Sequence, residues 1–122
     1  MTENDNDRIA LVIAAHPDDG DFGCAGWTAQ RAAEGWDVRF LICTNGAKGT
    51  EDRAMSRQRL IALRREEQQE ACRRMGATEV YFLDNEDGEL VYDRRLLEQV
   101  VRHIRMVRPH TVLSHDPAPR PA

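Results

Sequence analysis

Apolar residues along the chain concentrate in short segments of strand length, which are separated by helical stripes and polar turns. An unbroken apolar run of strand length lies at residues 9–15, and three further segments of strand length, at 37–44, 79–83 and 111–115, are rich in apolar residues. An unbroken apolar run of this length is typical of a parallel strand that is covered on both faces. The pattern therefore predicts four β-strands.

Three segments between the runs have the character of helices. An alanine-rich segment at about 22–34 stops before Gly35, and a longer one at about 55–75 stops before Gly76. Glycine is a common residue just beyond the end of a helix. Asp93 is a suitable cap for a third helix that ends near Pro109. The residues expected to face inward are Leu60, Leu63, Glu67, Ala71 and Met75 on the second helix, and Leu96, Leu97, Val100, Val101, Ile104 and Val107 on the third.

Strands that alternate with helices indicate an α/β fold with a Rossmann-like, doubly wound parallel sheet. We expect a disordered leader at residues 1–8, one domain at 9–117 and a proline-rich end at 118–122. A sheet that ends on its fourth strand would leave an edge exposed. The sequence therefore looks like the N-terminal part of a longer domain.

Composition and charge narrow the classes of function. The 122 residues suffice for one modest domain, and a net charge of −4 without a basic patch argues against a nucleic-acid partner. The three cysteines are scattered, which favours reduced thiols in the cytoplasm over a disulfide framework. No signal peptide is evident, and the run at 9–15 is too short to span a membrane. A homo-oligomer is compatible with these features.

Polar side chains follow every predicted strand. In an open parallel sheet, ligands bind beyond the carboxyl ends of the strands, so these residues are expected at one rim. They are His16, Asp18, Asp19 and Asp21 after the first strand, Thr44 and Asn45 after the second, Asp84, Asn85 and Asp87 after the third, and His115 and Asp116 after the fourth.

The turn after the first strand, His16-Pro17-Asp18-Asp19, carries the most distinctive chemistry. Pro17 restricts the backbone, so the flanking side chains diverge in set directions. An imidazole beside carboxylates suits zinc, which in catalytic sites commonly has three protein ligands and one open position. The spacing alone fits equally well a solvated turn with an aspartate that caps the next helix.

This turn is similar to the signature of the PIG-L (LmbE-like) family of zinc-dependent N-deacetylases. The resemblance extends over about residues 9–117 and keeps its motifs in order. The matching segments are HPDD at 16–19, the helix, strand and loop at 22–50, RREE at 64–67, YFLDNEDGEL at 81–90 and HTVLSHDP at 110–117. It implies a hydrolase that removes an acetyl group from an N-acetylated, glycoside-like small molecule or a similar amide.

The resemblance also implies roles for individual residues. His16 and Asp19 match the zinc ligands of the family, and Asp18 matches its general base. Arg64 and Asp87 match positions that contact the substrate. From the sequence alone, Arg64 fits equally well a salt-bridging surface arginine, and Asp87, which precedes a glycine, fits a turn residue.

The chain departs from the family pattern at two places. Gly20 stands where family members often have glutamate, which bears on substrate contacts more than on the metal. The third zinc ligand of the family is a histidine in an HxDH-type motif after the fourth strand, expected beyond residue 122. His115 is assigned to the fourth strand, and His103 and His110 are expected as exposed residues at a helix end.

Two other classes of function compete with this one. A dinucleotide-binding Rossmann domain would carry a GxGxxG turn after its first strand, whereas this chain has HPDDGD, whose negative charge repels phosphates. A catalytically incomplete fragment would bind zinc weakly with two ligands. Metal analysis and an amine-release assay on this chain and on a longer form separate that interpretation from the enzyme.

Overall fold

Strands and helices alternate in the computed structural model, which describes residues 8–14, 25–44, 56–85 and 93–114. The elements are β1 (Ile9–Ala14), α2 (Ala25–Ala33), β2 (Asp37–Thr44), α3 (Arg57–Met75), β3 (Glu79–Asn85), α4 (Arg94–Val107) and β4 (Thr111–Leu113). Every predicted strand and helix is present, with ends that differ by a few residues. The leader and the proline-rich end, Arg8 apart, lie outside the described ranges and stay predictions.

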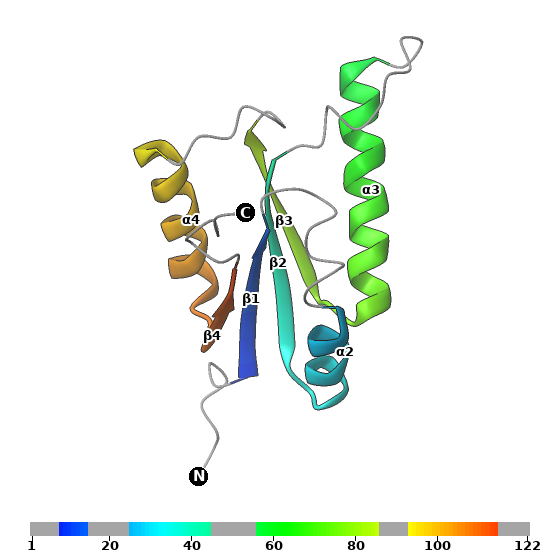
Figure 1. The fold of residues 1–122 in the computed structure, drawn as a ribbon, viewed down its shortest axis with the longest axis vertical. Helices are drawn as coiled ribbons and strands as arrows, with labels where there is room; N and C mark the ends of the chain where they lie inside the picture. Colours follow the sequence, from blue (N-terminus) through cyan, green and yellow to red (C-terminus); the bar gives the residue numbers. More distant parts are fainter. Residues whose placement is uncertain (1–7, 15–24, 45–55, 86–92, 115–122) are drawn as a thin grey trace, which may run out of the picture.

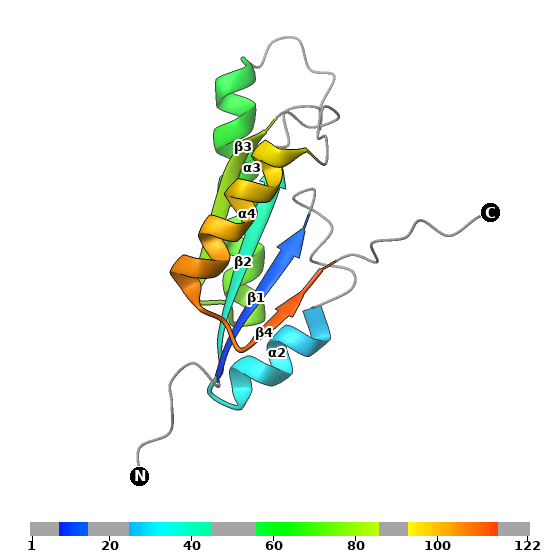
Figure 2. The ribbon, with the colours of Figure 1, turned by 90° about the vertical axis from the view of Figure 1, so that its left-hand side faces the viewer.

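The four strands form one parallel sheet in the order β3-β2-β1-β4 (Figure 1). Starting from β1, the chain adds β2 and β3 on one side and then returns to place β4 on the other. Helices α2 and α3 cover one face of the sheet and α4 covers the opposite face, as the two views show (Figure 2). This is the predicted doubly wound, Rossmann-like arrangement, and the fold class is confirmed.

The central strands are buried on both faces, which explains the unbroken apolar run of β1 and the apolar stretch at residues 40–43 of β2. Residues that alternate along β1 and β2 face α2 and α3, and those between them face α4. The first set is Ala10, Val12, Ala14, Val38, Phe40 and Ile42, with Cys72 from α3. The second set is Leu11, Leu41, Cys43 and Leu83, with Leu96 and Val107 from α4.

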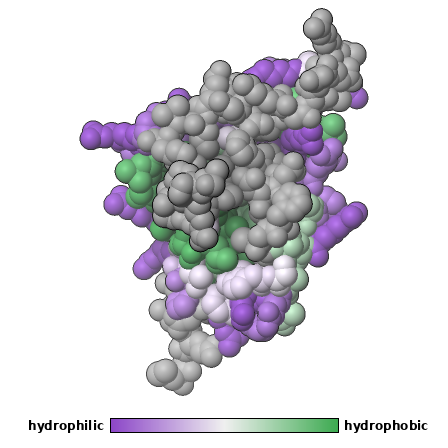
Figure 3. All heavy atoms as spheres, in the orientation of Figure 1, coloured by the Kyte–Doolittle hydropathy of each residue, from purple (hydrophilic) through white to green (hydrophobic). Residues whose placement is uncertain are grey.

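Strand β4 is a short edge strand. It pairs only with β1 among the described strands, and Val112 is 44% exposed. On the face seen in Figure 3, hydrophilic residues predominate along the two flanks and apolar residues appear between them. None of the described helices is long and apolar enough to cross a membrane.

The buried stripe of α3 differs from the predicted one. Leu60 is buried as expected, but Leu63 is 38% exposed and Glu67 is exposed. Gln68 and Cys72 are buried instead, and the Gln68 amide donates to the Cys72 sulfur at 3.3 Å. The prediction was wrong in the middle of the helix. Gln68 and Cys72, joined by this hydrogen bond, face inward there, whereas the apolar periodicity assigns the inward positions to Leu63 and Glu67.

Helix α4 begins and packs largely as predicted. The Asp93 carboxylate accepts a hydrogen bond from the Leu96 amide at 3.0 Å, which confirms the N-terminal cap. Leu96 and Val107 are buried, and Val100 and Ile104 pack beside them. Leu97 was expected to face inward but is 62% exposed, because the six apolar positions cover more of the helix circumference than the sheet can contact. Arg108, with φ 54°, ends the helix.

His103 and His110 differ in how far they are exposed. His103 was expected to be exposed at a helix end; it lies within α4, partly buried, with its ring 5.6 Å from that of Tyr81. That expectation was wrong because His103 is on the side of α4 that faces the sheet, where its ring meets Tyr81 of β3. His110 is exposed as predicted and follows the helix. Its ring lies 6.0 Å from that of Trp36, which in turn meets Trp27 edge-on at 6.3 Å.

The end of α3 approaches α2 closely. Gly76 has φ 98°, and its amide donates to the Arg73 carbonyl to end the helix. A Cβ atom at this position would lie 2.5 Å from the Cβ of Ala32. Glycine is therefore required here both by the backbone and by the space between two helices. Gly35, at the end of α2, has φ 90° but no such close neighbour.

Candidate active site

The carboxyl ends of the parallel strands define one rim of the sheet, at the top of Figure 1. Strand β1 ends at Ala14, between β2 and β4. The connections from β1 and from β3 lead to opposite sides of β1, so the switch point in strand order lies beside β1. Ligands of open α/β sheets bind at this switch point.

Most of the predicted site residues follow these strand ends directly but lie outside the described ranges. His16, Asp18 and Asp19 come after β1, and Asp87 comes after β3. Within the described ranges, no group of three or more histidine, cysteine or acidic side chains could hold a metal ion. The structure therefore shows only which strand each of these residues follows in the chain, and their roles stay predictions.

Arg64 is the predicted site residue whose surroundings the structure describes. Helix α3 runs from the carboxyl end of β2 back to the amino end of β3, so Arg64 is in the half of the helix nearer the rim. Its side chain is 28% exposed, and Nη1 lies 3.3 Å from the Glu67 carboxylate. The salt bridge that the sequence allowed is present, and a contact with substrate remains a prediction.

A side-chain amide ties three elements together at the rim. Asn85 Nδ2 donates to the Cys43 carbonyl of β2 at 3.0 Å and to Oε1 of Gln99 in α4 at 3.1 Å. The pairing of β2 with β3 is irregular here, because Ile42 pairs with Phe82 but Thr44 pairs with Asn85. The sequence placed Asn85 at the rim without a role. Nothing in the sequence marks Gln99 as its partner, since the contact depends on how α4 returns over the sheet.

The Cys43 thiol beside this tie is not a chemical participant at neutral pH. Cys43 is 5% exposed, and burial raises its pKa to about 11. A thiol is nucleophilic and binds metal as the thiolate. Cys43 is therefore a packing residue.

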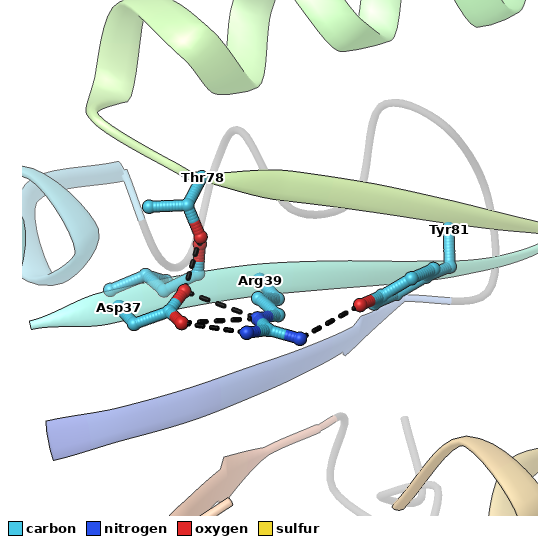
Figure 4. A network of polar contacts seen from close by, with 5 residues as sticks. Asp37, Arg39, Thr78 and Tyr81 are labelled. Atoms are coloured by element: carbon cyan, nitrogen blue, oxygen red, sulfur yellow. Dashed lines mark hydrogen bonds and ion pairs between the residues drawn. The ribbon is translucent and has the colours of Figure 1, made fainter. Parts of the chain in front are cut away.

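The amino half of the sheet carries a different polar network (Figure 4). The Arg39 guanidinium lies 2.8 Å from the Asp37 carboxylate and donates to the Tyr81 hydroxyl at 3.0 Å. Thr78 donates to the same carboxylate. The hydrogen bond from Arg39, with a smaller contribution from Thr78, holds the pKa of Asp37 below its ordinary value against the opposing effect of burial. The network joins β2 to β3 far from the rim, so it is structural.

Comparison with known proteins decides which family this arrangement belongs to. The model of the PIG-L family, described as GlcNAc-PI de-N-acetylase, matches residues 11–121. The chain belongs to the PIG-L family. The resemblance seen in the sequence is thereby confirmed, and the rim of the sheet is the part of this PIG-L chain where the family motif HPDD follows β1.

Relatives of this PIG-L chain include enzymes of two kinds. Diacetylchitobiose deacetylase of Thermococcus kodakarensis is 36% identical over 114 residues, which cover 93% of the chain and 42% of the relative. The N,N'-diacetylchitobiose deacetylase structure from Pyrococcus horikoshii has a TM-score of 0.82 at 32% identity, covering 86% of the chain and 39% of the relative. The 4-carboxy-2-hydroxymuconate hydratase GalB from Pseudomonas putida has a TM-score of 0.79 at 30% identity, with coverages of 90% and 49%. The chain thus spans less than half the length of these relatives.

Proposed function

We propose that the protein is a zinc-dependent hydrolase that removes the acetyl group from an N-acetylated sugar or a similar amide. The observation that carries this proposal is the HPDD motif directly after β1, the central strand beside the switch point, in a chain of the PIG-L family. The names of two relatives, both deacetylases of diacetylchitobiose, support a small N-acetylated glycoside as the substrate.

The donor set fits zinc. His16 offers an imidazole and Asp19 a carboxylate, two of the ligand types that zinc prefers, and both follow the strand that ends at the switch point. We assign these two residues as ligands, with a third expected beyond residue 122. When bound, zinc lowers the pKa of a coordinated water from about 15.7 towards about 7 and polarises a carbonyl oxygen.

The remaining residues act on the proton and on the substrate. Asp18 accepts a proton from the water that attacks the acetyl carbonyl, and the proton then passes to the leaving nitrogen. The C–N bond breaks, and the products are acetate and a free amine. Arg64 and Asp87 contact the polar groups of the substrate. We also place the protein in the cytoplasm, because its three cysteines are scattered along the sequence, which favours reduced thiols over a disulfide framework.

Substitution of Asp18 by asparagine tests the assigned chemistry. In the natural protein at full length, Asp18→Asn should keep its zinc content and lose amine release by about 10²- to 10⁴-fold, the usual share of general base catalysis. His16→Ala should lose zinc and activity together. Glu98→Gln removes an exposed carboxylate of α4 and serves as a control for charge. Unchanged turnover of Asp18→Asn, or a zinc-free active enzyme, contradicts the proposal.

A second candidate reaction follows from the hydratase relative. At 30% identity and a TM-score of 0.79, GalB resembles this chain about as closely as the deacetylase structure does. The alternative is addition of water to an unsaturated carboxylic acid at the same rim. Assay of both substrate classes with one preparation separates them, since deacetylation releases acetate and a hydratase consumes a conjugated double bond without releasing anything.

A further inference from the structure

We propose that Asn85 is a positioning residue, which holds the end of β3 and the start of α4 in the arrangement that the rim needs for substrate binding. The inference rests on the proposed function for its kinetic consequence, and on described contacts for its structural part. Asn85 ends β3, whereas the residues assigned to zinc follow β1, so its effect can be measured separately from metal binding.

The chemistry of the contacts fixes the orientation of both amides. A backbone carbonyl oxygen only accepts hydrogen bonds, so the Asn85 atom that faces the Cys43 carbonyl at 3.0 Å is the nitrogen. The same nitrogen lies 3.1 Å from the Gln99 side chain, which must therefore present its oxygen. Both hydrogens of the Asn85 amide are thus used, one on β2 and one on α4.

The position of this contact explains what it controls. Between Ile42 and Thr44 strand β2 advances by two residues while β3 advances by three, from Phe82 to Asn85. A ladder with such a bulge loses regular pairing at that point. The Asn85 side chain supplies β2 with a donor there, and so secures the strand ends where main-chain pairing is irregular.

The bond to Gln99 links the two elements on either side of the segment 86–92. Strand β3 ends at Asn85, and α4 starts at Arg94 behind its cap, Asp93. Asp87, the predicted substrate contact, is two residues beyond Asn85 in the chain. The Asn85 amide thus holds together the strand end from which this segment leaves and the helix to which the chain returns.

A purely structural tie between β2 and β3 provides the matched control. The bond from Arg39 to the Tyr81 hydroxyl also joins these two strands, in the amino half of the sheet. Tyr81→Phe removes that bond and should lower thermal stability without changing kinetics. Asn85→Asp keeps the size of the side chain but loses both donors and sets a carboxylate against two oxygen atoms.

The experiment measures zinc content, kcat, KM and amide hydrogen exchange in the natural protein and its variants. Asn85→Asp should lower kcat/KM roughly tenfold, chiefly through KM, with zinc content unchanged. Exchange of backbone amides in the first two turns of α4 should become faster than in Tyr81→Phe. Gln99→Leu should show a smaller effect of the same kind, and Gln99→Glu, which keeps an acceptor oxygen, should restore near-normal KM.

Several outcomes overturn the inference. Kinetics of Asn85→Asp equal to those of Tyr81→Phe at matched folded fraction would make Asn85 merely structural, and loss of zinc would assign it to the metal site. If no substrate is deacetylated, the proposed function fails, and hydrogen exchange still decides the structural part: unchanged protection of α4 in both Asn85→Asp and Gln99→Leu refutes it. Should Asn85→Asp fail to fold, Gln99→Leu carries the test.

Discussion

Replacement of Gly76 by alanine tests the close approach of α3 to α2. The new methyl group would meet two obstacles, a backbone φ of 98° and the Cβ of Ala32 at 2.5 Å. At Gly35 the φ of 90° is similar, but the nearest atom to a new Cβ is a side-chain nitrogen of Arg8 at 3.8 Å. The two glycines therefore separate backbone strain from steric overlap.

The magnitudes follow from these two obstacles. A left-handed conformation costs an L-residue roughly 1–2 kcal/mol, and the stiffer unfolded chain returns about 0.4–1 kcal/mol. Overpacking between the helices adds roughly 1–3 kcal/mol. Gly35→Ala should thus cost about 1 kcal/mol and Gly76→Ala about 2–4 kcal/mol, which corresponds to about 4 °C in Tm per kcal/mol for a domain of this size.

Thermal unfolding followed by calorimetry and urea denaturation followed by circular dichroism measure both variants. The double variant Ala32→Gly/Gly76→Ala removes the methyl group of residue 32 that the new side chain at position 76 would strike, at a cost of roughly 0.5–1 kcal/mol for glycine in a helix. It should therefore be less destabilised than the sum of its single variants by about 1–3 kcal/mol. Additive losses, or equal losses at Gly35 and Gly76, would refute the reasoning.

Three further predictions concern charge, capping and thiol chemistry. The folded-state pKa of Asp37 lies below its ordinary value, so its contribution to stability is present above about pH 4 and is lost as the pH falls through the lower value. Asp37→Asn should therefore cost most stability near neutrality and progressively less in acid, as measured by urea denaturation across pH. A difference in stability that does not depend on pH contradicts this. Asp93→Ala removes the bond to the Leu96 amide and should cost about 1 kcal/mol, whereas Asp93→Asn keeps an acceptor and should cost far less; equal midpoints for all three proteins would exclude a capping role. Cys43, with a pKa raised to about 11 and its side chain buried, should resist alkylation at about pH 8 until urea is added, as measured by mass spectrometry of its peptide; rapid labelling of the native protein counts against its burial.

The fold was predictable from the sequence because its central strands are buried on both faces. Such strands leave continuous apolar runs, and the alternation with helices then allows few topologies. The faces of the helices were less predictable. On α3, Gln68 and Cys72 take inward positions through a mutual hydrogen bond, which a pattern of apolar residues does not record.

The candidate site also has one part that the sequence predicts and another that it does not. The HPDD motif identified the family, because its residue types and its place after the first strand are both distinctive. The rim contacts of Asn85 were not predictable, since they join Cys43 and Gln99 across a bulge and a returning helix. Arg64 allowed two interpretations in the sequence, and the structure shows the salt bridge, which it forms with Glu67 one turn further along the helix.

The edge-to-face pair formed by Trp27 and Trp36 has a practical consequence for work on this protein. These are the only two tryptophans among its 122 residues, and Trp36 directly precedes β2, at the sheet end opposite the rim. Tryptophan fluorescence of this chain therefore reports how α2 docks on the sheet. A rim variant with an unaltered emission spectrum has kept the docking of α2 on the sheet, so its kinetic defect arises elsewhere in the molecule.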